Sequence, residues 1–165
     1  MKTYLENLAR YNKKDNERFH ETLLQQPAGL LQLPIVSSFA SIQETMKHLY
    51  DAETAWWLRL NDPASSYNFK DPFPGSFAEL LHAHASRSKQ WVDYIESSDE
   101  KTLKGEFLYM RGGVEMRSRI HDMLVHLFNH GTYHRGQLVT MMRQTGITEL
   151  PATDYILYCR MHMPL

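Results

Sequence analysis

Apolar residues recur at helical spacing over four long stretches of the chain. In residues 3–26 they are Leu5, Leu8, Tyr11, Phe19, Leu23 and Leu24. In residues 38–60 they are Ile42, Leu49, Ala52, Trp56 and Leu60. Spacings of three and four residues place side chains on one face of an α-helix. The pattern therefore predicts a long amphipathic helix in each of these two stretches.

The third and fourth stretches lie in the second half of the chain. Residues 76–97 carry an apolar stripe made of Phe77, Leu80, Leu81, Ala85, Trp91 and Ile95. The longest pattern, in residues 119–145, has Ile120, Met123, Leu124, Leu127, Gly131, Leu138 and Met142 near one broad face. Four long helices joined by loops predict an all-α fold, a four-helix bundle formed by a single domain over residues 1–165.

Polar residues at the borders of these stretches indicate where the helices begin and end. Three Ser/Thr-x-x-Glu pairs have the spacing of a capping box, namely Thr3 with Glu6, Ser41 with Glu44, and Ser76 with Glu79. Gly146 is the natural end of the fourth helix. Beyond it, Thr153 is expected to cap a short last helix with the sequence DYILYCRMH.

Two segments between the helices show other patterns. Residues 62–75 hold three prolines and predict an irregular loop. In residues 99–118, apolar positions lie on either side of Arg111, Gly112 and Gly113, as they do on the two strands of a hairpin. We therefore expect a short β-hairpin before the last long helix.

Composition narrows the class of protein. The chain has 18 basic and 19 acidic residues, which removes the usual electrostatic basis for nucleic-acid binding. A single cysteine, Cys159, cannot form an internal disulfide and favours a reducing, cytoplasmic setting. The first residues mix charged and apolar positions and have neither the apolar centre of a signal peptide nor a membrane-spanning run. A soluble protein with no membrane partner is expected.

The candidate chemistry lies in HLFNHGTYHRGQ, residues 126–137. His130 and His134 are one helical turn apart and point toward the core side, whereas His126 lies at the edge of that stripe. Two imidazoles at this spacing can present nitrogens to one divalent ion, but a third ligand must come from another helix. His48, beside the apolar stripe of the second helix, is the best candidate.

Other interpretations of the polar residues stay open at this point. A core histidine bonded to a carbonyl would give the same pattern. His82 and His84 face different ways on their helix, and three more histidines have no partner at this spacing, namely His20, His121 and His162. Trp56 and Trp57 are expected to serve packing and Arg135 to form a salt bridge. The carboxylates of Glu44, Asp51 and Glu53 are most simply a solvated helix face, although Glu44 could orient His48.

Three segments, taken together, resemble the DinB/YfiT-like superfamily of metalloenzymes. LARYNKKDNERFHETL, residues 8–23, is similar to the opening helix of that family, which often reads YN-x-W-A-N-E-R. SIQETMKHLYDAETAWWLRL, residues 41–60, resembles its second helix. HLFNHGTYHRGQLVTMMRQTG, residues 126–146, is similar to its N-H-x-x-H-H-R-G-Q stretch. Asp154, Tyr155 and Tyr158 also resemble the D-x-x-x-Y pattern near the end of the family's sequences.

The resemblance implies an up-and-down four-helix bundle with an unusual helix order and a divalent metal bound by three histidines. Carried over by position, the metal ligands are His48, His130 and His134. Two departures stand out, because Lys14 and Asp15 replace the tryptophan segment of the first helix and Tyr133 replaces a histidine beside the second ligand. Neither departure affects the three expected ligands.

Three neutral imidazoles leave coordination positions for water or substrate, as in catalytic sites. Zinc or nickel is the expected metal, although imidazole also suits iron and copper. Members of the superfamily include metal-dependent hydrolases and thiol-dependent transferases, so a small-molecule substrate is expected, with a low-molecular-weight thiol as a candidate cosubstrate; the catalytic side chains stay unassigned.

The alternative is a non-catalytic, stress-related bundle with a structural metal or none. The damage-inducible name of the family suggests DNA binding, which the near-neutral charge disfavours. Homodimers are common in the family, so the resemblance also implies a homodimer.

Overall fold

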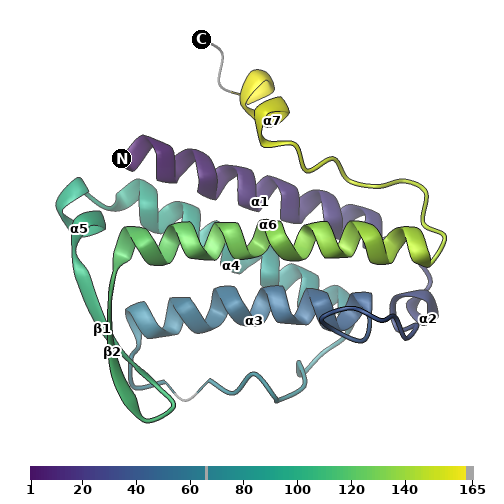
Figure 1. The fold of residues 1–165 in the computed structure, drawn as a ribbon, viewed down its shortest axis with the longest axis horizontal. Coiled ribbons are helices and arrows are strands. Elements are labelled where there is room, and N and C mark those ends of the chain that lie inside the picture. Colours follow the sequence, from purple (N-terminus) through teal and green to yellow (C-terminus); the bar gives the residue numbers. More distant parts are fainter. Residues whose placement is uncertain (66, 163–165) are drawn as a thin grey trace.

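The computed structural model describes residues 1–65 and 67–162. Four long helices form its body, and they are α1 (Lys2–Leu24), α3 (Ile42–Asn61), α4 (Phe77–Ser97) and α6 (Ile120–Gln144). The shorter elements are α2 (Ala28–Leu31), α5 (Glu100–Lys104), β1 (Glu106–Arg111), β2 (Val114–Arg119) and α7 (Tyr155–His162). The prediction of an all-α four-helix bundle is confirmed (Figure 1).

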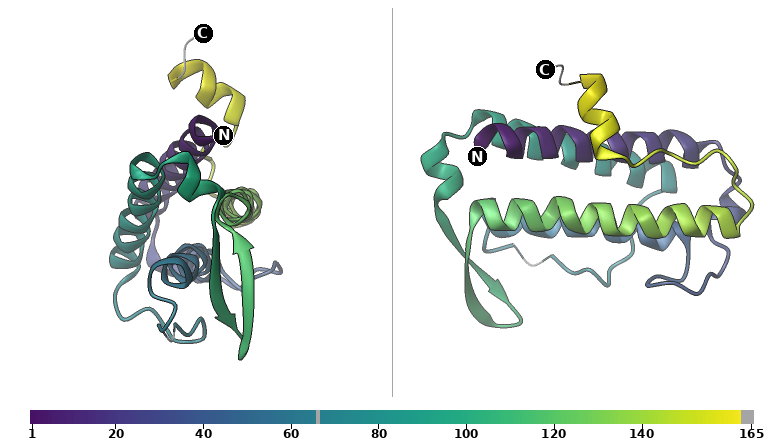
Figure 2. Two further views of the ribbon diagram at one scale, coloured as in Figure 1. Left: turned by 90° about the vertical axis from the view of Figure 1, so that its left-hand side faces the viewer. Right: turned by 45° about the horizontal axis from the view of Figure 1, so that its top comes forward.

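The order of the four helices departs from simple up-and-down alternation. Helix α1 packs against α4 and α6, and α3 packs against the same two helices. Residues 62–65 and 67–75 lie along the outside of the bundle between the end of α3 and the start of α4, so α3 and α4 point the same way (Figure 1). An end-on view shows the four axes at the corners of one bundle, with the hairpin beside α3 and α6 (Figure 2).

The expected caps are confirmed only in part. Ser76 and Glu79 form a complete capping box at the start of α4, and Gly146 follows α6 with a φ of 84°. The box expected at Thr3 is wrong, because α1 already begins at Lys2 and has no side-chain cap. Glu6 instead lies 3.7 Å from the amine of Lys2.

Two further helix starts differ by a few residues from expectation. Helix α3 begins at Ile42 and not at residue 38, because Ser41 is its N-cap and accepts the N–H of Glu44. The Glu44 carboxylate bonds the N–H of Ala40, so this capping box is incomplete. At α7 the cap is Asp154, whose carboxylate accepts the N–H of Ile156, and not Thr153.

The expected β-hairpin is present between α5 and α6. Strands β1 and β2 pair antiparallel, with Arg111 opposite Val114 beside the turn. Gly112 and Gly113 occupy that turn with φ of 60° and 80°, the left-handed conformation that a two-residue hairpin loop needs at both positions. The buried side chain of Tyr109 faces the bundle and lies edge-on to Trp56.

The core of the bundle consists of two apolar clusters near its two ends. One is built around Phe19, Leu49, Leu81, Leu138 and Met142, and the other around Leu5, Trp91, Ile95, Leu124 and Leu127. Between them lie buried polar side chains of all four long helices, which are Asn12, Asp15, Asn16, Glu53, His84, Ser88 and Arg135. We call this set the polar layer.

The predictions about packing aromatics are confirmed, since Trp56 and Trp57 both pack against the second apolar cluster.

Among the helices that the structure describes, none has the combination of length and apolar character that a membrane crossing requires.

Candidate metal centre

Three histidine side chains meet between α3 and α6. The Nε2 atom of His130 lies 3.0 Å from the Nε2 atom of His48 and 3.0 Å from that of His134. A tetrahedral ion with Zn–N bonds of about 2.05 Å would separate two ligand nitrogens by roughly 3.3 Å. The three nitrogens are therefore close to the arrangement that one ion requires, and the group could hold a metal ion.

The helical framework explains how these residues come together. His130 and His134 are four residues apart on α6, so their rings lie on the same side of that helix. Helix α3 packs directly against α6 and brings His48 to the same place. The structure thus assembles the three histidines expected from the sequence.

Gln137 orients one of these rings. Its Oε1 atom lies 2.7 Å from Nδ1 of His134, so Nδ1 carries the proton and donates to it. The tautomer leaves the lone pair of Nε2 free to bind an ion. The amide nitrogen of Gln137 donates in turn to the Ser38 hydroxyl at 2.7 Å and to the Tyr133 hydroxyl at 3.0 Å. Sequence reasoning gave Gln137 no such role.

An aromatic ring covers the cluster on the side of the loop before α3. Phe39 stacks on His48 with ring centroids 4.3 Å apart, and its centroid lies 5.6 Å from that of His134. The ring shields this side of the imidazoles from water. Sequence reasoning gave Phe39 no role, because it precedes the apolar stripe that begins at Ile42; the structure places it outside the helix, in the irregular segment before α3.

The environment keeps the three imidazoles neutral. Burial, followed by the neighbouring histidines, lowers the pKa of His48 and of His130 to about 4. Burial also lowers the pKa of His134, although its bond to Gln137 opposes this shift. A neutral imidazole is the form that binds a metal ion. At neutral pH the three rings are consequently in their ligand form.

His126 lies outside this group, as the helical geometry predicts. Its side chain is exposed, and its ring centroid lies 5.9 Å from that of His130 and 5.7 Å from that of Trp56. It is a neighbour of the three-histidine cluster and extends the cluster toward the hairpin.

Two of the carboxylates expected on a solvated face are in fact buried. Asp51 is 4% exposed and accepts hydrogen bonds from the Lys47 amine and the Tyr67 hydroxyl, both at 2.7 Å. Glu53 is 5% exposed and belongs to the polar layer. Only Glu44 is exposed, at the start of α3. The expectation for Asp51 and Glu53 was wrong because apolar periodicity does not identify a polar residue that is buried against partners from other segments.

Glu53 lies at the centre of hydrogen bonds from two other helices. Its Oε1 atom accepts the side-chain amides of Asn12 at 2.9 Å and Asn16 at 3.1 Å, and its Oε2 atom accepts the Ser88 hydroxyl at 2.9 Å. Burial alone would raise the pKa of Glu53, but His84 and these hydrogen bonds outweigh it and lower the pKa. The carboxylate is therefore charged and fully engaged.

Arg135 is the cation of the polar layer. It is fully buried and donates from Nη1 to Asn12 Oδ1 at 2.7 Å and to Asn16 Oδ1 at 2.8 Å. Its Nε lies 3.8 Å from Asp15 Oδ2, so the expected salt bridge is present. Gly131 makes room for the hydrogen bond between Arg135 and Asn12, because a Cβ at position 131 would lie 2.8 Å from Asn12 Oδ1. Asp15, noted as a departure in the first helix, thus contributes to the layer.

A second pair of histidines consists of His84, which belongs to the polar layer, and His20, which lies beside it. His20 Nε2 is 3.1 Å from His84 Nδ1, and His84 Nε2 is 3.4 Å from Glu53 Oε1. Spacing along the sequence suggested a partner for neither residue, because His20 belongs to α1 and His84 to α4. His84 thus uses one ring nitrogen toward His20 and the other toward Glu53, and among the described residues no third histidine converges on this pair.

The fold and this centre define a class: a four-helix bundle that presents three convergent, neutral imidazoles between two helices. The chain belongs to the DinB family, whose profile matches residues 1–164. It is similar to Protein DinB of Bacillus subtilis (strain 168), with 27% identity over an aligned length of 165 that covers 96% of this chain and 95% of that protein. The family resemblance carried by the three sequence segments is confirmed.

Proposed function

We propose that this protein is a metal-dependent enzyme that transfers a small thiol to an electrophile, with His48, His130 and His134 as ligands of zinc or nickel. The observation that carries the proposal is the convergence of one ring nitrogen from each of the three histidines, all within 4.8 Å of one another. Within the described residues, this group contains no fourth histidine, cysteine or carboxylate, so it resembles catalytic sites, which keep a position for substrate.

The metal supplies one kind of chemistry, in which a divalent ion lowers the pKa of a thiol or a water molecule and polarises an electrophile. The residues of the chain have the supporting tasks. Gln137 holds His134 in the tautomer that offers Nε2, and Phe39 excludes water from one side of the cluster. Burial keeps the imidazoles unprotonated.

The surrounding carboxylates favour thiol transfer over hydrolysis. Helix α3 carries Glu44, Asp51 and Glu53, and each already accepts hydrogen bonds from other groups. Helix α6 carries only Asp122, two turns before His130. Activation of water usually needs a general base, whereas a thiol has an ordinary pKa of about 8.5 and can lose its proton without one.

The proposed reaction balances without a further reagent. The thiol sulfur forms a bond to the electrophilic carbon, and the leaving group departs with the electron pair of the bond that breaks. The thiol proton passes to solvent. Hydrolysis by the same centre is the second candidate, since a water molecule would occupy the position that we assign to the thiol.

Metal analysis tests the first part of the proposal. Protein purified without an affinity tag is expected to contain one zinc or nickel ion per chain. His130→Ala should abolish stoichiometric binding, while His126→Ala, which changes an exposed neighbour, should leave it intact. Absence of bound metal in the wild type after incubation with either ion would refute the proposal and favour the non-catalytic bundle.

Activity assays test the second part. Metal-loaded protein should accelerate the coupling of low-molecular-weight thiols to a fluorogenic electrophile, and His130→Ala should remove this rate. A nitrophenyl ester assayed in parallel reports hydrolysis. Turnover of the ester alone would replace the transferase by the hydrolase, and turnover of neither substrate by a metal-loaded protein would contradict the enzymatic assignment for these substrate classes.

A further inference from the structure

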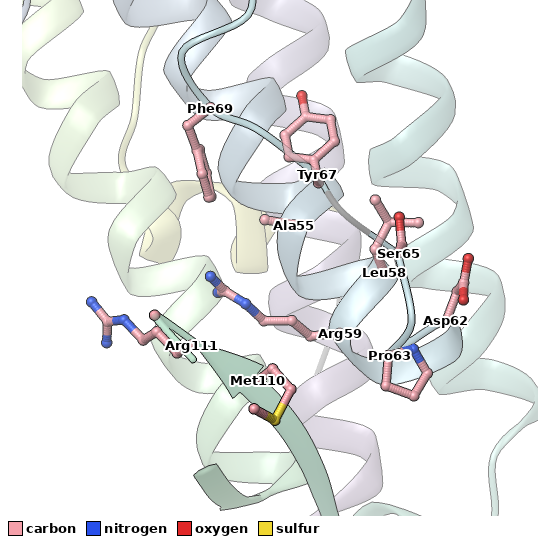
Figure 3. Close-up of a pocket in the computed structure, with 11 residues that line it drawn as sticks. Ala55, Leu58, Arg59, Asp62, Pro63, Ser65, Tyr67, Phe69, Met110 and Arg111 are labelled. Atoms are coloured by element: carbon pink, nitrogen blue, oxygen red, sulfur yellow. The ribbon is translucent and has the colours of Figure 1, made fainter. Parts of the chain in front are cut away.

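A cavity of about 260 Å³ lies between α3, the segment that follows it and the tip of the hairpin (Figure 3). Its walls include two arginines, Arg59 from α3 and Arg111 from β1, together with the polar side chain of Ser65. Met110 and Phe69 supply apolar surface. The cavity thus combines cations, a hydroxyl and apolar contacts, the composition of a small-molecule site.

Arg59 is held in place by aromatic rings and not by an acid. Its guanidinium lies 4.6 Å from the ring centroid of Trp56 and 5.6 Å from that of Tyr109. Other arginines of the bundle, such as Arg10 and Arg135, form ion pairs. In the described part of the chain, Arg59 and Arg111 belong to no ion pair, although Arg59 is partly buried.

The charges around the cavity leave the cations without an internal counterion. Burial, with the charge of Arg111 also contributing, lowers the pKa of Arg59, so a negative charge beside it would be stabilising. Asp62 also lines the cavity, but its carboxylate lies on the opposite side from the Arg59 guanidinium (Figure 3). A guanidinium that is fixed, partly desolvated and unpaired is well suited to a carboxylate or phosphate ligand.

The cavity lies on the same side of α3 as the metal centre. Ala55 and Arg59 follow His48 by seven and eleven residues, so all three point within about 20° of one direction. The Ala55 level lies about 10 Å along the helix axis from His48. Figure 3 shows the Arg59 guanidinium on the side of the cavity that faces Ala55 and Phe69. Ala55 precedes Arg59 by about one turn on α3, in the direction of His48.

From this geometry we propose that the substrate of the metal centre is an extended molecule with an oxyanion group at one end, which Arg59 binds with help from Arg111. Its reacting group would lie at His48, His130 and His134, and in that respect the inference rests on the proposed function. Anion binding at Arg59 depends only on the cavity. A carboxylate and a phosphate ester share the chemistry required.

Nuclear magnetic resonance of metal-free protein tests the anion site directly. The indole N–H of Trp56, which lies under the Arg59 guanidinium, is followed during titration with phenyl phosphate, benzoate and the neutral analogue phenol. Saturable shifts in the millimolar range are expected for at least one anion and not for phenol. The anion that binds more tightly identifies the group as a phosphate ester or a carboxylate.

Substitutions make the test specific. Arg59→Gln should weaken anion binding at least about tenfold, because it removes a charge-assisted hydrogen bond. Arg59→Lys keeps the charge, serves if the glutamine variant does not fold, and should bind more weakly because it lacks the planar fork. Arg143→Gln, at an exposed arginine near the far end of α6, is the matched control and should bind as the wild type does.

The inference is overturned if neither anion gives a saturable shift, if phenol binds equally, or if both Arg59 variants bind as the wild type does. Because the titration uses metal-free protein, its outcome is independent of the metal analysis. If the protein binds an anion at Arg59 but no metal, the proposed function is refuted, whereas the anion site is retained.

Discussion

Two groups of histidines in the same bundle differ in what their ring nitrogens contact. His48, His130 and His134 direct three Nε2 atoms toward one point. His20 and His84 are as close to each other, at 3.1 Å, but His84 uses both ring nitrogens, one toward His20 and the other toward Glu53. Both groups are shielded from water, and burial lowers the pKa of His20 as it lowers those of His48 and His130.

The difference shows that proximity and burial do not by themselves make a metal centre. What distinguishes the first group is that lone pairs converge while Gln137 binds a nitrogen on the far side of a ring. In the second group the ring nitrogens of His84 face His20 and Glu53, and the Glu53 carboxylate already accepts hydrogen bonds from α1 and α4, so no set of three lone pairs converges. In the first group the lone pairs of three ring nitrogens stay available to an ion. In the second group the ring nitrogens of His84 make contacts that join three helices.

The largest effect is expected when one histidine of each group is replaced by alanine and the two variants are compared. We expect His84→Ala to lower the free energy of unfolding by about 3 kcal/mol, because it leaves a cavity and removes a buried partner of Glu53. Its metal content should match the wild type. His48→Ala should remove metal binding and change the stability of metal-free protein by about 1 kcal/mol or less. Urea unfolding and metal analysis of both variants would expose an error in the comparison if the two effects were reversed.

The orienting bond from Gln137 should have a smaller effect that concerns only the metal. Gln137→Leu is expected to weaken metal affinity by roughly 10–100-fold, the range typical for loss of a group that orients a metal-bound histidine. Competition with a chelator of known affinity measures this change. Gln144→Leu, at an exposed position of the same helix, is the control. Equal affinity of Gln137→Leu and wild type would mean that the Gln137 contact does not support the site.

The third effect, also smaller than the effect of His84→Ala, concerns acid stability and belongs to the second group. Burial, with His84 and His82 contributing, lowers the pKa of His20 from 6.5 to about 2 in the folded protein. The unfolded chain takes up this proton below about pH 6.5, so the contribution of His20 is present above that pH and is lost as the pH falls. Between pH 7.5 and pH 5 this group should cost about 2 kcal/mol.

His20→Gln should remove that part of the pH dependence, measured as the difference between unfolding free energies at the two pH values. His162→Gln, at an exposed position in α7, should retain it. A pH dependence unchanged by His20→Gln would show that His20 is not the group that stays neutral in the fold.

The sequence specified the local parts of the fold and of the centre. Apolar periodicity identified the four long helices, and the two glycines identified the hairpin turn, because both signals depend on neighbours within one element. The four-residue spacing placed His130 and His134 on one side of α6 for the same reason. Caps were less reliable, since an N-cap competes with adjacent residues that have nearly the same hydrogen-bonding capacity, as Thr153 and Asp154 do.

Contacts between helices were decided by the tertiary structure. Periodicity states which side of a helix is buried, but the rotation and sliding of two packed helices determine which residues meet. The meeting of His48 with the pair on α6 was inferred through the family resemblance as much as through its place beside an apolar stripe. Burial of Glu53, the pairing of His20 with His84 and the place of Arg59 beside a cavity exist only after four helices and a hairpin have packed, because their partners are distant in sequence.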